Sequence, residues 1–171
     1  MILIISTCAD KLSEQEFVWP IARIVKNGYV VRHFTEGKKI KNIDKYDKII
    51  ICGTALKDND YQKDLTHFDW LETNAPVLGI CSGMQILGMY FGGKLVKQKR
   101  IGMGKIKTIV DNPLFKGEFD AYELHGFTVD GDFEYLAEDK KAFRKDNKYG
   151  IIFHPEVRNE QIIRNFIGTD F

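Results

Sequence analysis

The stretch from residue 76 to residue 93 constrains the fold more than any other part of the chain. It begins with an apolar run, residues 76–80 (PVLGI), and continues without a linker into apolar residues at helical spacing. A continuous apolar run is typical of a strand buried on both faces, and the spacing that follows it is typical of a helix. We therefore expect a strand that turns sharply into a helix, with Cys81 at the turn.

Cys81 is a candidate nucleophile. The backbone amides and the dipole at a helix N-terminus favour a thiolate and lower the pKa of a cysteine placed there. Gly79 and Gly83 flank the cysteine at the spacing of the G-x-S-x-G nucleophile elbow, where small neighbours permit a strained backbone. A lone cysteine at such a junction is more often buried and inert, but the two glycines and the nearby Gln85 favour catalysis here.

Charge and cysteine content exclude several classes of protein. The 171 residues carry 25 Lys and Arg against 24 Asp and Glu, a balance that argues against binding a nucleic-acid backbone. Cys8, Cys52 and Cys81 are odd in number and lack C-x-x-C spacing, so they predict neither disulfides nor a metal site. Residues 1–5 are too short an apolar run for a signal or membrane segment. We expect a cytoplasmic protein with no metal, no cofactor and no membrane association.

Apolar segments alternate with helical patterns along much of the chain. The expected strands are residues 2–6, 29–34, 48–52, 76–80 and 151–153. Together with a late run of short strands, this pattern predicts an α/β fold, a mostly parallel central sheet covered by helices on both faces with a small antiparallel arm. The length, and the absence of repeats or linkers, predict one domain spanning residues 1–171.

The first helix has two possible starting points. Residues 13–16 (SEQE) resemble a capping box that opens a helix running to about Asn27. Pro20 is awkward inside such a helix, so a later start near Trp19, with the proline in the first turn, is the alternative.

The remaining segments carry coarser expectations. Residues 55–74 are expected to form a loop and then a helix that packs through Phe68, Trp70 and Leu71. Residues 94–110 are expected to be extended, and residues 118–136 to form an antiparallel arm or a pair of hairpins beside the main sheet. A closing helix is expected at residues 159–166.

His154 and Glu156 are candidates for the base that a thiol nucleophile requires. The base must lie within hydrogen-bond reach of the thiol and needs an acceptor that fixes its tautomer. Residues i and i+2 of an extended segment project to the same side, so Glu156 can accept from one ring nitrogen of His154 while the other faces Cys81. On turn chemistry alone, residues 154–156 (HPE) are equally well explained as a surface turn.

Gly53, Cys81 and His154 each directly follow an expected strand. Ligands of a parallel sheet gather outside the carboxyl ends of its strands, so we expect these three residues to meet. Acyl transfer also needs donors for the developing oxyanion. The backbone amide of Ser82 is one candidate, and Gly53, which permits close approach of the backbone, is the other. Taken locally, Gly53 is more simply explained as a tight exit from a strand.

Two motifs together resemble those of the class I (triad) glutamine amidotransferases. Residues 79–85 (GICSGMQ) resemble the G-x-C-x-G-x-Q signature of that family, and residues 153–157 (FHPEV) resemble its F-H-P-E-x ending. The motifs occur in the family's order, with Gly53 where the oxyanion loop should lie. The resemblance covers essentially the whole chain and implies a flavodoxin-like sandwich and a substrate held in part by Gln85.

The resemblance also implies a reaction, the hydrolysis of the glutamine side-chain amide to glutamate and ammonia. Cys81 would attack the amide and form a γ-glutamyl thioester, with His154 and Glu156 completing the triad. Gly53 and Ser82 would bind the oxyanion through their backbone amides. In this family the ammonia passes to a synthase domain or subunit, so glutamine as substrate and a separate, ATP-using synthase as partner are expected.

Two further segments resemble the separate glutaminase subunit of archaeal-type GMP synthases. They are residues 112–117 (NPLFKG) and 124–126 (LHG). By that resemblance His125 lies near the substrate and the synthase contact. The chain departs from the usual pattern at the oxyanion loop, where residues 53–55 are GTA instead of G-G-P, and at residues 124–127, where LHGF replaces S-H-x-D.

Other functions of the same scaffold stay open. One is a stand-alone γ-glutamyl hydrolase or peptidase with the same triad. Another is the amidotransferase subunit of a different biosynthetic synthase, and a third is a non-catalytic binding or regulatory subunit. The basic stretch from Lys94 to Lys107 could dock an acidic synthase face, although a solvated surface is its simpler explanation.

Overall fold

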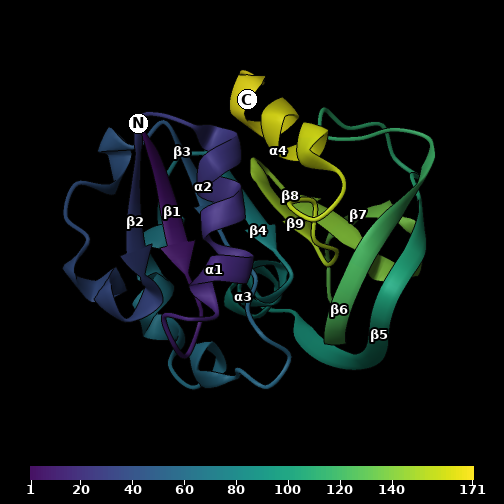
Figure 1. Ribbon diagram of the computed structural model, residues 1–171, viewed down its shortest axis with the longest axis horizontal. Coiled ribbons are helices and arrows are strands. Elements are labelled where there is room, and N and C mark those ends of the chain that lie inside the picture. Colours follow the sequence, from purple (N-terminus) through teal and green to yellow (C-terminus); the bar gives the residue numbers. More distant parts are fainter.

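A seven-stranded sheet forms the centre of the computed structural model, which describes residues 1–171 (Figure 1). In order across the sheet the strands are β2 Tyr29–His33, β1 Ile2–Ser6, β3 Lys48–Ile51, β4 Val77–Ile80, β9 Lys148–Ile151, β8 Ala142–Lys145 and β7 Glu134–Ala137. Neighbouring strands from β2 to β9 are parallel, and β8 and β7 form an antiparallel edge. The predicted α/β class with a mostly parallel sheet is confirmed.

Helices cover both faces of this sheet. The α-helices are α1 Glu14–Phe17, α2 Trp19–Val25, α3 Ser82–Tyr90 and α4 Glu160–Gly168. The 3-10 helices are η1 Phe34–Lys39, η2 Ile43–Lys45, η3 Asp60–Gln62, η4 Leu65–Glu72 and η5 Glu138–Lys140. None of them has the length and the apolar run that crossing a bilayer requires.

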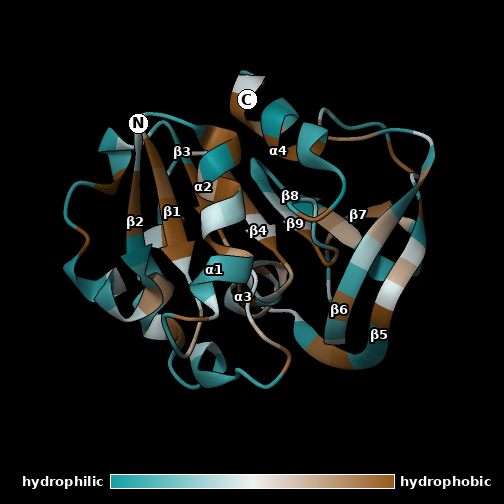
Figure 2. Ribbon diagram, in the orientation of Figure 1, coloured by the Kyte–Doolittle hydropathy of each residue, from teal (hydrophilic) through white to brown (hydrophobic).

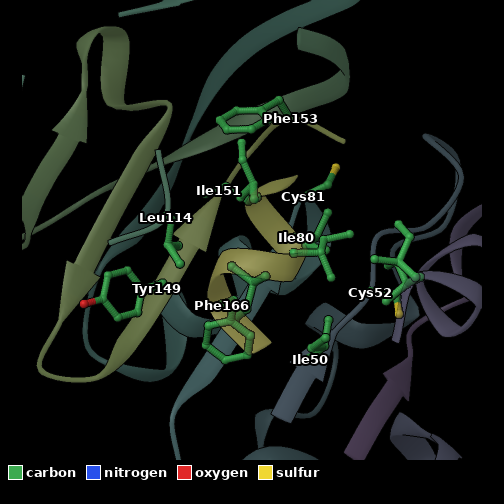
Figure 3. Packing of buried hydrophobic residues seen from close by; sticks show 14 of the residues in the cluster. Ile50, Cys52, Ile80, Cys81, Leu114, Tyr149, Ile151, Phe153 and Phe166 are labelled. Carbon is green, nitrogen blue, oxygen red and sulfur yellow. The ribbon is translucent and has the colours of Figure 1, made fainter. Parts of the chain in front are cut away.

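The core lies in two layers, one on each side of the sheet. Ile2 and Ile4 of β1 belong to a cluster with residues of α1, α2 and α4, whereas Leu3 and Ile5 belong to a second cluster with residues of α3 and η4. Successive side chains of a strand point to opposite faces, which is why β1, β3 and β4 are apolar along most of their length (Figure 2). In Figure 3, Cys81 lies beside Ile80 with its sulfur turned away from the inner part of the first cluster.

The antiparallel arm consists of β5 Lys94–Lys107 and β6 Glu118–Asp130. The prediction for residues 118–136 is right for β6 and wrong for residues 134–136, which belong to β7 at the edge of the main sheet. β7 pairs with β8, its neighbour in the chain, and β8 pairs with β9 of the main sheet. Hydrophobic periodicity does not specify which sheet such a hairpin joins.

Residues 13–27 form two short helices instead of one. The Ser13 hydroxyl donates to Asp10 Oδ2 at 3.3 Å and caps no helix, so the capping-box prediction is wrong. The alternative start is correct, because α2 begins at Trp19 with Pro20 in its first turn. A proline there loses no hydrogen bond, since the first N–H groups of a helix have no partner within it.

Residues 55–74 contain the 3-10 helices η3 and η4 where a loop and an ordinary helix were expected. Phe68, Trp70 and Leu71 are buried, as predicted. Residues three apart lie on the same side of a 3-10 helix, so η4 can bury Phe68 and Leu71 together.

Candidate active site

Cys81 occupies the sharp turn between β4 and α3, as the sequence predicts. Its backbone has φ 51° and ψ −104°, a conformation that side chains rarely adopt, and only 5% of the residue is exposed. A Cβ on Gly79 would lie 2.4 Å from the Gly83 carbonyl oxygen, and a Cβ on Gly83 would lie 2.4 Å from the Ile51 carbonyl oxygen. The two glycines of the motif are therefore required by close packing around the turn.

Two hydroxyl groups connect the turn to the main chain directly after β3. Ser82 Oγ and Thr7 Oγ1 lie 2.8 Å apart, and both donate to the Cys52 carbonyl oxygen, at 3.0 and 3.1 Å. The Ser82 side chain is thus occupied, whereas its backbone N–H belongs to the first turn of α3, which has no partner within the helix. Thr7 is absent from the sequence predictions. Its position directly after the first strand, like that of Gly53, is the signal that could have found it.

His154 and Glu156 form the pair that their spacing predicts. His154 Nδ1 lies 2.8 Å from Glu156 Oε1, each of the two side chains is only 1% exposed, and His154 Nε2 has no hydrogen-bond partner. Burial alone lowers the pKa of His154, but the charges of Cys81 and Glu156 outweigh it and hold that pKa well above its ordinary value. A raised pKa favours the imidazolium, the form that His154 adopts once it has taken a proton from the Cys81 thiol.

Gly53 brings the elbow and the histidine together. A Cβ at this position would lie 2.7 Å from His154 Cε1 and 3.3 Å from Cys81 Cβ. Only a residue without a side chain allows the loop after β3 to pass so close to both groups. The three residues that follow predicted strands do meet at one edge of the sheet.

A cavity of about 380 Å³ opens at this edge. Its lining comprises Thr54, Ala55, Leu56, Asp58, Asn59, Tyr61, Cys81, Ser82, Gln85, Lys97, Lys99, Leu124, His125, Gly126 and Phe127. Four of the residues singled out in the sequence therefore share this cavity, and strand β6 of the arm supplies one of its walls. Leu124 of β6 lies next to the nucleophile, since its carbonyl oxygen is 3.4 Å from Cys81 Sγ.

Gln85 is held rigidly on the first turns of α3. Its Oε1 accepts from the Tyr61 hydroxyl at 2.5 Å, and its Nε2 donates to the Phe127 carbonyl oxygen at 3.1 Å. Burial raises the pKa of Tyr61, so its hydroxyl keeps the proton that it donates. Tyr61 was missed by the sequence predictions, and its mixed, polar surroundings in the chain contain no signal for it.

His125 lies in a buried polar network on β6. Its Nε2 is 3.1 Å from Glu123 Oε1, Lys141 Nζ donates to Glu123 Oε2 at 3.1 Å, and His125 Nδ1 has no partner. Burial raises the pKa of Glu123, but hydrogen bonds from His125 and Lys141 outweigh it and lower that pKa. Glu123 was missed, although it stands two residues from a histidine just as Glu156 does. Nothing in the sequence connects Lys141 to this group.

Comparison with known proteins places the chain in a family. The profile of the family described as Glutamine amidotransferase class-I matches residues 17–168. A GMP synthase [glutamine-hydrolyzing] from Thermomicrobium roseum is 32% identical over 169 residues, which cover 86% of this chain and 32% of that protein. The chain thus spans about one third of the length of that relative.

Two further proteins are covered over most of their own length. Anthranilate synthase component 2 of Saccharolobus solfataricus is 32% identical over 165 residues, covering 82% of this chain and 85% of that one. The crystal structure of a candidate GMP synthase subunit from Thermoplasma acidophilum superimposes with a TM-score of 0.81 at 22% identity, covering 98% of this chain and 92% of the other. The fold and the matched sequence agree, and the chain belongs to the class I glutamine amidotransferase family.

Proposed function

We propose that residues 1–171 form a single glutaminase domain, which hydrolyses the side-chain amide of glutamine to glutamate and ammonia. The observation that carries the proposal is the approach of the Gly53 backbone to both Cys81 and His154. Of these three residues, Cys81 also lines the cavity. Nucleophile, base and oxyanion donor are thereby assembled around one small volume, as acyl transfer requires.

In the first half of the reaction, Cys81 Sγ attacks the carbonyl carbon of the substrate amide. The base is His154 Nε2, which Glu156 leaves free by accepting at Nδ1. The developing oxyanion accepts hydrogen bonds from the backbone N–H groups of Gly53 and Ser82. Collapse of the tetrahedral intermediate breaks the C–N bond, and His154 gives its proton to the departing ammonia.

In the second half, water attacks the γ-glutamyl thioester while His154 takes up its proton. The C–S bond breaks, the thiol is regenerated and glutamate leaves. Gln85, fixed by Tyr61 and Phe127, holds the substrate together with His125. The sum of the two halves is glutamine plus water giving glutamate plus ammonia, with no external oxidant or reductant.

The proposed consumer of the ammonia is a separate, ATP-using synthase of the GMP synthase type. Relatives named as glutamine-hydrolysing GMP synthases support the acceptor class. The match covers 85% of a protein named Anthranilate synthase component 2, which supports a synthase partner on a separate chain. The same match favours a second candidate function, the glutaminase subunit of another biosynthetic synthase. A cytoplasmic location is part of the proposal, since three free cysteines suit a reducing compartment.

The test is to measure glutamate and ammonia released from glutamine by the purified chain. The assay is run alone and with the GMP synthase-type synthase of the same organism, its nucleotide substrate and ATP. Release that rises with the synthase and its substrates supports the proposed partner. Turnover of γ-glutamyl peptides that does not change when the synthase is added would favour a stand-alone hydrolase and contradict the proposal.

Gly53→Ala is expected to lower kcat/KM for glutamine by about a hundredfold or more, the usual effect of losing one oxyanion donor. The added methyl would press on His154 Cε1 and Cys81 Cβ and displace the loop. Steady-state kinetics check the value, and Gly168→Ala, outside the cavity lining, is the matched control, since a Cβ there meets nothing within 4 Å. Full activity of Gly53→Ala would contradict the assignment of its amide.

A further inference from the structure

The carbonyl oxygen of Cys52 lies between two buried hydroxyl groups. Ser82 Oγ is 3.0 Å from it, Thr7 Oγ1 is 3.1 Å from it, and the two hydroxyl oxygens are 2.8 Å apart. No backbone N–H donates to this carbonyl. A buried carbonyl needs a donor, and here side chains supply it in place of the main chain.

The three groups come from the ends of neighbouring strands. Thr7 directly follows β1, Cys52 directly follows β3, and Ser82 is the first residue of α3, just beyond β4. Strands β1, β3 and β4 are adjacent in the sheet, so their carboxyl ends lie side by side (Figure 1). The contact is therefore made at the same edge of the sheet as the turn that holds Cys81.

The hydroxyls act on the amide of Gly53 through the peptide bond. The Cys52 carbonyl and the Gly53 N–H belong to one peptide unit, which is trans. In a planar trans peptide the C=O and the N–H point in opposite directions. Two hydrogen bonds that fix the Cys52 carbonyl therefore fix the direction of the Gly53 N–H as well.

The Gly53 N–H depends on such support. It donates to no acceptor within the protein, and its residue has no side chain that could hold the loop. Glycine also rotates more freely about φ and ψ than other residues. An oxyanion donor is most effective when it is oriented before the charge develops, because no reorganisation is then needed during the reaction.

We propose that the Thr7 and Ser82 hydroxyls position the Gly53 amide as an oxyanion donor, by holding the carbonyl of the same peptide. The inference rests on the proposed glutaminase function and deepens it, because it names the groups that orient one of the two donors. Ser82 then has two tasks, since its backbone N–H is the other donor and its side chain orients the first. Thr7 lies outside the cavity lining and is a positioning residue.

Thr7→Val tests the proposal, because it removes one hydroxyl and nearly preserves the shape of the side chain. In steady-state assays of glutamate release, kcat is expected to fall about tenfold, since the oxyanion forms only in the transition state. KM should change little. Thr7→Ser keeps the hydroxyl and is expected to retain most of kcat. Wild-type kcat in Thr7→Val, or a loss of the same size in Thr7→Ser, would overturn the inference.

Gly53→Ala provides a background in which the orientation of this amide no longer matters, because the added methyl displaces the loop. If Thr7 acts through the Gly53 amide, adding Thr7→Val to Gly53→Ala should lower kcat little further. Losses that multiply in the double variant would mean that Thr7 acts by another route, and would overturn the inference.

Thr128→Val is the matched control for the loss of a buried hydroxyl. The Thr128 hydroxyl donates to the Lys140 carbonyl oxygen at 2.7 Å, and Thr128 is buried outside the cavity lining. Urea unfolding should show a loss of stability comparable to that of Thr7→Val, while kcat stays at the wild-type value. An equal fall of kcat in the two variants would overturn the inference, because reduced stability would then explain both.

Alkylation of Cys81 by iodoacetamide separates the oxyanion from the thiol. Iodide leaves as the sulfur–carbon bond forms, and no oxyanion develops, so mass spectrometry should find equal labelling rates in the wild type and in Thr7→Val. Equal slowing of alkylation and of glutamine hydrolysis would overturn the inference, because the effect would then lie on Cys81 itself. A wild type that is alkylated at Cys81 but releases no glutamate, alone or with the synthase, would instead contradict the proposed function.

Discussion

Replacing Cys81 with alanine is expected to lower the rate of glutamine hydrolysis by about four orders of magnitude or more, the scale on which removal of a covalent nucleophile acts. No other thiol can take its place. Cys8 and Cys52 are both buried, and burial raises the pKa of each above the ordinary value, which keeps the two thiols protonated and unreactive. Release of glutamate, measured by an end-point assay over long incubation, gives the residual rate.

Cys52→Ala is the matched control for this variant. Its side chain belongs to the apolar cluster of the sheet, while its contacts with Ser82 and Thr7 are made by the main chain and survive the change. Activity close to that of the wild type is expected, with a modest loss of stability. If Cys81→Ala hydrolysed glutamine at a rate close to that of the wild type, the thioester mechanism would be wrong.

His154→Asn is expected to be nearly as damaging as the loss of Cys81. Asparagine can still hydrogen-bond to Glu156, but it cannot take the thiol proton or return it to ammonia. Residues that act as one unit have non-additive effects, so the double variant Cys81→Ala, His154→Asn should be no slower than the worse single variant. Additive losses in this double-mutant cycle would mean that the two residues act independently.

The same histidine predicts how stability depends on pH. Its pKa in the folded protein lies well above the ordinary 6.5, so its protonated form is stabilised by folding. That contribution is fully present below about pH 6.5 and is lost as the pH rises through the folded-state pKa. Urea unfolding across this range should show the free energy of unfolding of the wild type falling relative to that of His154→Asn. A constant difference between the two proteins would contradict the raised pKa.

Local sequence patterns were sufficient to predict the turn that holds Cys81 between strand and helix. Gly79, Cys81 and Gly83 lie within one strand and helix, so the sequence spacing alone fixes their relation in space. The pair of His154 and Glu156 was predictable from their closeness in the sequence, but the expected extended segment is wrong. Residues 154–157 form a turn in which the Val157 N–H donates to the His154 carbonyl oxygen at 3.2 Å.

Contacts between distant segments were not predictable in this way. Thr7 reaches Ser82 across 75 positions of the chain, and Tyr61 reaches Gln85 from a 3-10 helix whose sequence is mixed and polar. Lys141, which directly follows η5, meets Glu123 only because η5 packs against β6. Local patterns can also fail within a few residues. The capping box predicted at Ser13 is wrong because the Ser13 hydroxyl donates to Asp10 and not to the backbone of the helix.

Trapping of the covalent intermediate tests the central claim most directly. The protein is mixed with glutamine, quenched in acid during turnover and digested, and the mass of the peptide containing Cys81 is measured. The account predicts a peptide heavier by one γ-glutamyl group attached at Cys81, which disappears in Cys81→Ala and accumulates when hydrolysis of the thioester is slowed. Sustained formation of glutamate with no adduct at Cys81, or with the adduct on another residue, would contradict it.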